Sequence, residues 1–107
     1  SHFNGLEEIT TPGMRNQVSP MWHLYHIHVA PEVREPLFNF LRQNEIAVQV
    51  NYIPAYAHPV FSENETRQGE FKNSESFYKS EISLPMYAGL RDEEFIKVLE
   101  TVSKYFA

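Results

Sequence analysis

Trp22-His23-Leu24-Tyr25 and Val48-Gln49-Val50-Asn51-Tyr52-Ile53-Pro54 are the two stretches that decide the fold of this chain. Apolar side chains alternate through both, a pattern that predicts strands over residues 22–30 and 46–52. Between them, residues 32–44 carry one apolar stripe at helical spacing, formed by Val33, Leu37, Phe40 and Leu41. We therefore expect a strand–helix–strand unit that ends in a proline-broken loop.

The remaining elements are predicted from the same periodicities. Residues 53–73 are expected to be mostly loop, followed by a short helix over 74–80 that Asn73 or Ser74 caps, and by a strand over 82–86. The strongest helical pattern covers residues 92–106, with a buried stripe expected at Phe95, Ile96, Leu99, Val102 and Phe106. The expected fold class is α+β, a small three-stranded, mostly antiparallel sheet with helices on one side.

Composition limits the functional class. The 107 residues point to one domain, and Ser1-His2 is interpreted as the remnant of an expression tag, leaving 3–107 as the domain. The net charge is −5 without any cluster of basic residues, which argues against nucleic acid as a partner. No run of about 18 apolar residues indicates a membrane span. Cysteine is absent, so thiol chemistry and disulfides are excluded and a cytoplasmic location is expected.

The loop after the second predicted strand carries the best candidate site. Tyr52, Tyr56 and His58 lie around Pro54 and Pro59. Their hydroxyls and imidazole could hydrogen-bond a sugar or a phosphate, or move a proton. The alternative interpretation is aromatic packing that pins the loop to the core.

The histidines allow a second hypothesis. His26 and His28 are expected on one face of the first strand, a spacing that metal sites use, with His58 and either Glu63 or Glu65 as further ligands. The competing interpretation is that His26 and His28 are half-exposed residues of a solvated sheet face. His23, on the face of Tyr25, is interpreted as a core histidine that supports the loop.

Six motifs follow one another along the chain: Trp22-His23-Leu24-Tyr25, Phe40-Leu41-Arg42, Val48-Gln49-Val50-Asn51-Tyr52-Ile53-Pro54, His58-Pro59, Gly69-Glu70-Phe71 and Ile82-Ser83-Leu84-Pro85-Met86-Tyr87-Ala88-Gly89-Leu90. In this order and spacing they resemble the C-terminal part of the DegT/DnrJ/StrS family of sugar aminotransferases, over residues 6–106. They are most similar to the branch that aminates 4-keto-6-deoxy nucleotide sugars, including the pseudaminic acid pathway type.

The resemblance implies the small domain of a fold-type I pyridoxal-phosphate (PLP) transferase. The intact enzyme would be a homodimer that moves an amino group from glutamate to a nucleotide-linked ketosugar. Its Schiff-base lysine would lie in an N-terminal PLP-binding domain that is missing here. No catalytic residue, metal or bound PLP is therefore expected in this fragment, which should be inactive alone.

By the same resemblance, Asn51, Tyr52, Tyr56 and His58 would bind substrate and His23 would support them. Asn51 and Tyr56 occupy the positions of the two histidines in the family's usual His-Tyr-x-Pro-x-His motif. Two other hypotheses remain open at this point. One is a freestanding α+β module that binds a ligand or regulates, and the other is the histidine-based metal module.

Overall fold

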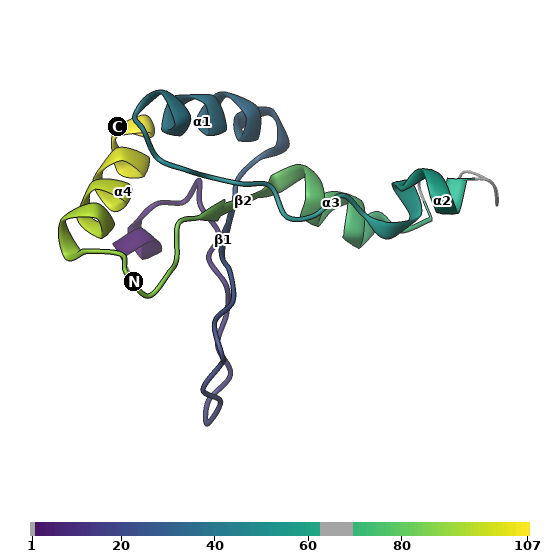
Figure 1. Cartoon of the computed structure of the whole chain (residues 1–107), viewed down its shortest axis with the longest axis horizontal. Coiled ribbons are helices and arrows are strands. Elements are labelled where there is room, and N and C mark those ends of the chain that lie inside the picture. Colours follow the sequence, from purple (N-terminus) through teal and green to yellow (C-terminus); the bar gives the residue numbers. More distant parts are fainter. Residues whose placement is uncertain (1, 63–69) are drawn as a thin grey trace.

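A computed structural model describes residues 2–62 and 70–107 of the chain (Figure 1). Its overall extents are 47 × 37 × 28 Å, because two extensions leave a compact centre. The elements run in the order η1 (His2–Gly5), β1 (Tyr25–His28), α1 (Pro31–Gln43), η2 (Ala55–Ala57), α2 (Pro59–Ser62), α3 (Lys72–Ser80), β2 (Glu81–Leu84) and α4 (Asp92–Tyr105). The α+β class is confirmed.

The sheet has two strands rather than the predicted three. β1 and β2 pair antiparallel, with Tyr25 opposite Leu84 and His28 opposite Glu81. The segment predicted as a strand over 46–52 contributes one isolated bridge, in which Gln49 and Ser83 exchange both backbone hydrogen bonds, at 3.2 and 2.7 Å. The first strand is also shorter than the predicted 22–30, because it covers only Tyr25–His28. Trp22 lies before it and is 44% exposed.

A hydrogen bond to a side chain explains why the third strand ends so early. Two residues after the Gln49 bridge, the Asn51 backbone N–H donates to the Glu81 carboxylate at 2.8 Å instead of to a backbone carbonyl. Because the ladder needs carbonyl acceptors at every second residue, it cannot continue past this point. The chain leaves the sheet here, and Tyr52 is 65% exposed.

The core lies between the apolar face of the sheet and the helices α1 and α4. Ile27 and Ile82 come from the sheet, Leu37 and Leu41 from α1, and Val102 from α4, and all are completely buried. Burying a side chain of this size contributes roughly 1.5–3 kcal/mol, so this cluster supplies most of the stability that a two-stranded sheet lacks. Phe3 of η1 closes the cluster from the N-terminal side.

The three long helices confirm the predicted periodicity, with changes at their ends and faces. α3 begins at Lys72 rather than Ser74, and neither Asn73 nor Ser74 caps it. On α4 the buried side chains are Val98 and Val102, whereas Phe95 and Ile96 are about half exposed. The buried stripe of α4 is therefore rotated toward Val98.

Not all helices lie on one side of the sheet. α3 contacts β1 on the opposite face from Ile27, because Phe77 of α3 packs against both His26 and His28. Neighbouring residues of a strand point to opposite faces, so this second face is the one that carries the histidines. The prediction of helices on one side is thus wrong for α3.

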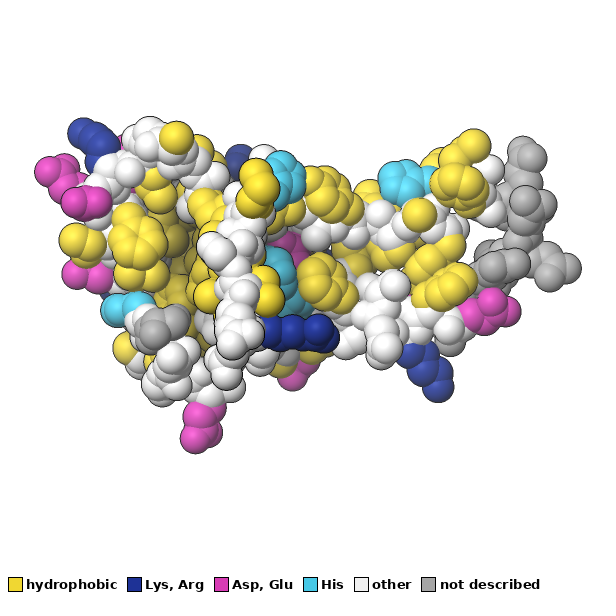
Figure 2. Space-filling model, turned by 90° about the horizontal axis from the view of Figure 1, so that it is seen from below, with side chains coloured by type: hydrophobic (Ala, Val, Ile, Leu, Met, Phe, Trp, Pro, Cys, Tyr) yellow, Lys and Arg dark blue, Asp and Glu magenta, His cyan; other side chains and the backbone are white. Residues whose placement is uncertain are grey.

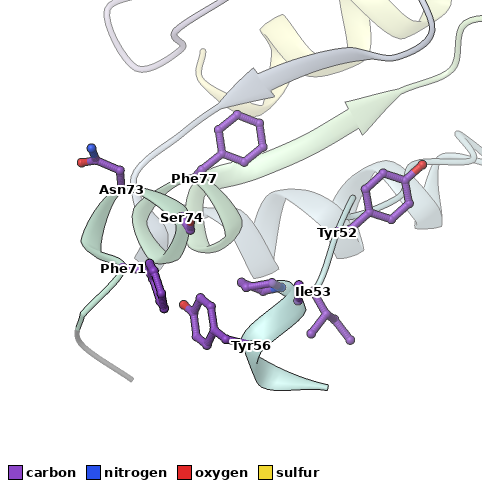
Figure 3. A pocket seen from close by; sticks show the side chains of 9 residues that line it. Tyr52, Ile53, Tyr56, Phe71, Asn73, Ser74 and Phe77 are labelled. Carbon is purple, nitrogen blue, oxygen red and sulfur yellow. The ribbon is translucent and has the colours of Figure 1, made fainter. Parts of the chain in front are cut away.

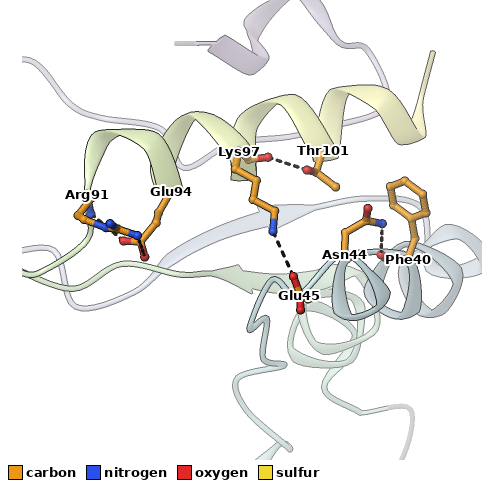
Figure 4. Close-up of polar contacts among 7 residues, drawn as sticks. All are labelled: Phe40, Asn44, Glu45, Arg91, Glu94, Lys97 and Thr101. Carbon is orange, nitrogen blue, oxygen red and sulfur yellow. Dashed lines mark hydrogen bonds and ion pairs between the residues drawn. The ribbon is translucent and has the colours of Figure 1, made fainter.

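α1 ends in a Schellman motif, a common helix stop. Ile46 N–H donates to the Leu41 carbonyl and Glu45 N–H to the Arg42 carbonyl, both at 3.0 Å. The left-handed residue is Glu45, with φ of 64°, and not Asn44, whose φ is −91°. Asn44 instead donates its side-chain amide to the Phe40 carbonyl at 2.8 Å (Figure 4).

The start of α4 is held by an arginine–glutamate pair. The Glu94 carboxylate accepts from the Arg91 backbone N–H at 2.9 Å and from its guanidinium at 3.1 Å (Figure 4). The backbone hydrogen bond and the charge of Arg91 lower the pKa of Glu94. Glu94 thus provides the half of a capping box that does not need a serine or threonine at position 91.

Two extensions leave the centre, one at each side of the sheet (Figure 1). Residues 11–24 run out and back between Thr10, which bridges to His28, and β1. The other extension carries η2, α2 and the start of α3. Hydrophobic side chains are visible along the face in Figure 2. Large exposed ones include Met14, Val18, Met21, Trp22, Tyr52, Ile53, Val60 and Phe61.

Two sequence interpretations concern the chain start. Ser1 lies outside the described residues. His2, interpreted as tag-derived, donates or accepts a hydrogen bond at 3.0 Å with the Ser103 hydroxyl and packs its ring edge on Phe3. Among the described residues, no helix has both the length and the apolar character needed to cross a bilayer.

We expect Glu45→Gly to raise the free energy of unfolding by about 1 kcal/mol. Glycine adopts positive φ without the clash of a Cβ, which costs roughly 1–2 kcal/mol in other residues. The lost ion pair, Lys97 Nζ to Glu45 Oε2 at 3.9 Å, is exposed and contributes little. Urea denaturation measures the difference. Glu45→Gln, which keeps the Cβ, is the matched control and should change stability by less than about 0.5 kcal/mol. A glycine variant no more stable than this control would contradict the strained-turn explanation.

Candidate functional site

An open groove of about 660 Å³ lies where the chain leaves the sheet (Figure 3). Its walls come from the segment after Asn51, from η2 and from the first half of α3. The lining residues are Tyr52, Ile53, Pro54, Ala55, Tyr56, Phe71, Asn73, Ser74 and Phe77. None of these described lining residues is a lysine or arginine, so the lining that they form is aromatic and polar without positive charge.

Prolines shape one wall of the groove. Pro54 stands directly before η2 with φ of −55°, and Pro59 opens α2. Proline fixes φ near −65° and suits the first residue of a helix, where its missing N–H is not needed. The loop between the two prolines is therefore stiff, and it presents Tyr56 to the groove.

Tyr56 and Phe71 form the aromatic pair at the centre of the groove. Their ring centroids are 5.0 Å apart with an interplanar angle of 24°, a stacked arrangement (Figure 3). Burial and a hydrogen bond with Glu75 of α3 raise the pKa of the Tyr56 phenol. The hydroxyl therefore stays protonated at neutral pH and serves as a hydrogen-bond donor rather than as a base.

Phe77 forms the inner wall, next to the sheet. Its ring centroid lies 4.5 Å from that of His28 and 5.3 Å from that of His26. The two imidazoles are joined by a 3.0 Å hydrogen bond, and His28 Nδ1 lies 2.7 Å from the Ser80 hydroxyl. Burial, and then the neighbouring His26, lower the pKa of His28. The histidine face of the sheet thus meets the groove through one phenylalanine.

A buried carboxylate fixes the point where the groove begins. Glu81 is 1% exposed and accepts hydrogen bonds from the Asn51 backbone N–H, at 2.8 Å, and from the Ser83 hydroxyl. Hydrogen bonds to a charged acceptor are about twice as strong as neutral ones. Glu81 therefore ties the first residue of the groove-forming segment to the start of β2.

The structure brings together only part of the predicted site. Tyr52 and Tyr56 line the groove, whereas Asn51 and His58 do not belong to the lining. The Asn51 side chain points to Gln49, with 3.5 Å between amide nitrogen and oxygen, and His58 is exposed at the end of η2. His23 is exposed, so its interpretation as a core histidine is wrong.

Three residues of the site went unnoticed in the sequence. Phe71 and Phe77 are spaced six residues apart around the start of α3, and their part in the groove depends on contacts with η2 and β1. Phe77 is 43% exposed. Glu81 had a visible signal, since a charged residue followed by Ile82-Ser83-Leu84 breaks the strand's apolar pattern on one face.

The described residues contain no group of three side chains able to hold a metal ion. His26 and His28 are bonded to each other, and His58 lies on the separate η2 extension. Glu63 and Glu65, the other candidate ligands, fall outside the described residues.

Comparison with known proteins identifies the family. Residues 1–103 match the model of the DegT/DnrJ/EryC1/StrS aminotransferase family. The chain belongs to this family. It is 39% identical, over 77% of its length and 24% of the relative's, to the UDP-4-amino-4,6-dideoxy-N-acetyl-beta-L-altrosamine transaminase of Campylobacter jejuni.

Solved structures of family members share the fold. Helicobacter pylori PseC, an aminotransferase of pseudoaminic acid biosynthesis, superposes with a TM-score of 0.80 at 26% identity, over 98% of this chain and 29% of PseC. Spr1654 of Streptococcus pneumoniae, a sugar aminotransferase solved in its PMP form, gives 0.84 at 26% identity, over 99% and 28%. The chain thus spans about a quarter of the length of these relatives.

The family uses PLP, so the lysines of this chain must be compared with what that cofactor needs. A Schiff-base lysine is desolvated or paired so that its amine loses its proton easily. All four lysines, Lys72, Lys79, Lys97 and Lys104, are exposed. The residues present do not fit the covalent anchor of PLP, and we assign no chemical step to the cofactor on this chain.

We expect Glu81→Ala to destabilise the chain by about 2–4 kcal/mol, because it leaves the Asn51 N–H and the Ser83 hydroxyl without their acceptor. Thermal and urea unfolding measure the loss. Glu100→Ala, at an exposed position of α4, is the matched control and should stay within about 0.5 kcal/mol of the parent. Equal effects of the two substitutions would show that Glu81 does not hold the groove segment.

Proposed function

We propose that this chain is the substrate-facing small domain of a nucleotide-sugar aminotransferase that uses PLP. In this proposal the amino group passes from glutamate to a 4-keto-6-deoxy sugar carried on a nucleotide. The observation that carries the proposal is the family match over residues 1–103. The transaminase named for a UDP-linked 4-amino-4,6-dideoxy sugar, at 39% identity, supports the sugar class.

The groove suits the sugar rather than the diphosphate of such a substrate. Its lining offers aromatic faces at Tyr52, Tyr56 and Phe71 and hydroxyls at Tyr56 and Ser74, but no cation. Aromatic rings pack on the apolar faces of sugars while hydroxyls bind their oxygens. The diphosphate, which needs positive charge, would be bound by other parts of the protein.

The proposed roles follow from these positions. Tyr52 and Tyr56 contact the sugar directly, and the Tyr56 hydroxyl, which donates its own proton to Glu75, accepts a hydrogen bond from a sugar hydroxyl. Asn51 and His58 stand at the two ends of the Tyr52–Ala57 segment, and we propose that they contact the substrate in the complete protein. His23 supports the Tyr52–Ala57 segment from the side of β1 in the complete protein, where the domain outside this chain covers His23.

The rest of the proposed enzyme lies outside this chain. A larger N-terminal domain supplies the lysine that anchors PLP, the protein is a homodimer, and it works in the cytoplasm. The exposed lysines support this division, since none of them is desolvated. The freestanding binding module, the alternative from the sequence, is not favoured by any feature of the groove.

We expect Tyr56→Phe in the full-length protein to raise the KM for the nucleotide sugar about 2- to 10-fold and to leave the KM for glutamate unchanged. The substitution keeps the stack on Phe71 but removes one hydrogen bond, worth about 0.5–1.5 kcal/mol. Steady-state kinetics with each substrate varied in turn gives both constants. Tyr87→Phe, at an exposed tyrosine outside the groove, is the control. Equal changes in both constants, or none, would remove Tyr56 from the sugar site.

We expect the full-length protein to be several times larger than this chain and to show the visible absorption of PLP bound to lysine. The isolated chain should be colourless and should transfer no amino group. Intact mass, an absorption spectrum and an assay with glutamate and a UDP-linked 4-keto sugar test this. Turnover by the isolated chain, or a colourless full-length protein, would contradict the proposal.

A further inference from the structure

A chain of hydrogen bonds fixes the tautomers of the two β1 histidines. The Ser80 hydroxyl donates its single proton to the carbonyls of Ser76 and Phe77, at 2.9 and 3.2 Å. With its proton on these carbonyls, the hydroxyl accepts from His28, whose Nδ1 lies 2.7 Å away, and this arrangement assigns the His28 proton to Nδ1. His28 Nε2 is then the acceptor of the 3.0 Å bond from His26 Nδ1–H.

The hydrogen bonds also determine which nitrogen atoms of the two histidines can bind further protons. His26 Nε2 has no hydrogen-bond partner among the described residues, so the first added proton binds there without breaking any bond. The second proton has only His28 Nε2 as its site. That nitrogen accepts the bond from His26, so its protonation breaks the link and places two positive imidazoles side by side.

Phe77 connects this chain to the groove. Its ring packs on both imidazoles and lines the groove, and its carbonyl accepts from Ser80. We propose that His26 and His28 are positioning residues for the groove, holding Phe77 in place through Ser80 for as long as the pair binds no more than one added proton. This inference goes beyond the proposed function, because it concerns the groove wall whatever ligand binds there.

The charged groups around the pair leave this order unchanged. Glu81 lies opposite His28 in the strand register, but its two oxygens are bonded to the Asn51 N–H and to the Ser83 hydroxyl. On α3, Lys79 is exposed and Glu75 is engaged with Tyr56. Arg34 of α1 donates to the Tyr78 carbonyl. Thr10, the other backbone neighbour of His28, carries no charge.

The direction of the pH effect follows from His28. Its pKa in the folded chain is lowered below the ordinary 6.5 by burial and by His26. Between those two values the unfolded chain binds the proton and the folded chain does not. Stability contributed by the neutral His28 is therefore complete above pH 6.5 and is lost as the pH falls toward the lowered pKa.

NMR of the 107-residue chain with labelled histidine and phenylalanine tests the proposal. At pH 7.5 we expect both imidazoles to be Nδ1–H tautomers in long-range ¹⁵N–¹H spectra. On acidification the NOE between Phe77 and His28 should persist until His28 itself binds a second proton, and it should vanish with that step. The methyl signals of Ile27 and Val102, in the core, should not shift at that step.

Variants separate positioning from general stability. Ser80→Ala should mix the tautomers and weaken the Phe77–His28 NOE at pH 7.5. The control is Ser76→Ala, which keeps the backbone carbonyl that Ser80 contacts, and it should preserve both the tautomers and the NOE. His26→Gln should leave one titration step and move it toward pH 6.5. An Nε2–H tautomer at His28, or a Phe77 NOE that survives full protonation, would overturn the proposal, as would loss of all core signals at the same step. None of these results bears on whether the groove binds a sugar.

Discussion

The structure depends on how β2 shares its hydrogen bonds between two neighbours. All four residues of β2 are buried, with β1 paired on one edge and the single Gln49–Ser83 bridge on the other. At the end of this second edge, the Glu81 carboxylate replaces a backbone carbonyl and accepts from Asn51. One side chain thus stops the third strand and sets the direction in which the groove segment leaves the core.

The two faces of the small sheet have different chemistry. One face is apolar and closed by α1 and α4, and it supplies the hydrophobic contribution to stability. The other carries His26, His28 and Ser83, whose polar atoms are bonded to one another, to Ser80 or to Glu81. A polar network of this kind specifies position only if its members are satisfied, and the described residues contain no buried side-chain polar atom without a partner. The groove lies on the side of this polar face, where hydrogen bonds rather than apolar burial fix the positions of the side chains.

Sequence periodicity predicted α1 and α4 because each of these helices places an apolar stripe against the core. It also predicted α3, although this helix has no buried residue and packs Phe77 on the histidine face of the sheet. It could not predict the loss of the third strand, since residues 46–52 alternate correctly and only a long-range contact with Glu81 ends the ladder. The sequence singled out Tyr52 and Tyr56, which line the groove, whereas Phe71 and Phe77 line it through tertiary contacts alone. His23 is not a core residue because β1 begins only at Tyr25, which leaves His23 on the exposed extension.

The pairing of β1 with β2 has a consequence for the order in which the chain folds. The strands are separated by roughly fifty residues, and closing a loop of that length costs entropy before any strand contact forms. α1 lies between them in sequence and needs only local contacts, so it can form first and bring the ends together. Both walls of the groove are attached to β2, one through the hydrogen bond from Asn51 to Glu81 and the other through α3, which runs directly into the strand. Since β2 pairs with β1 late, the groove forms only after the two strands have paired.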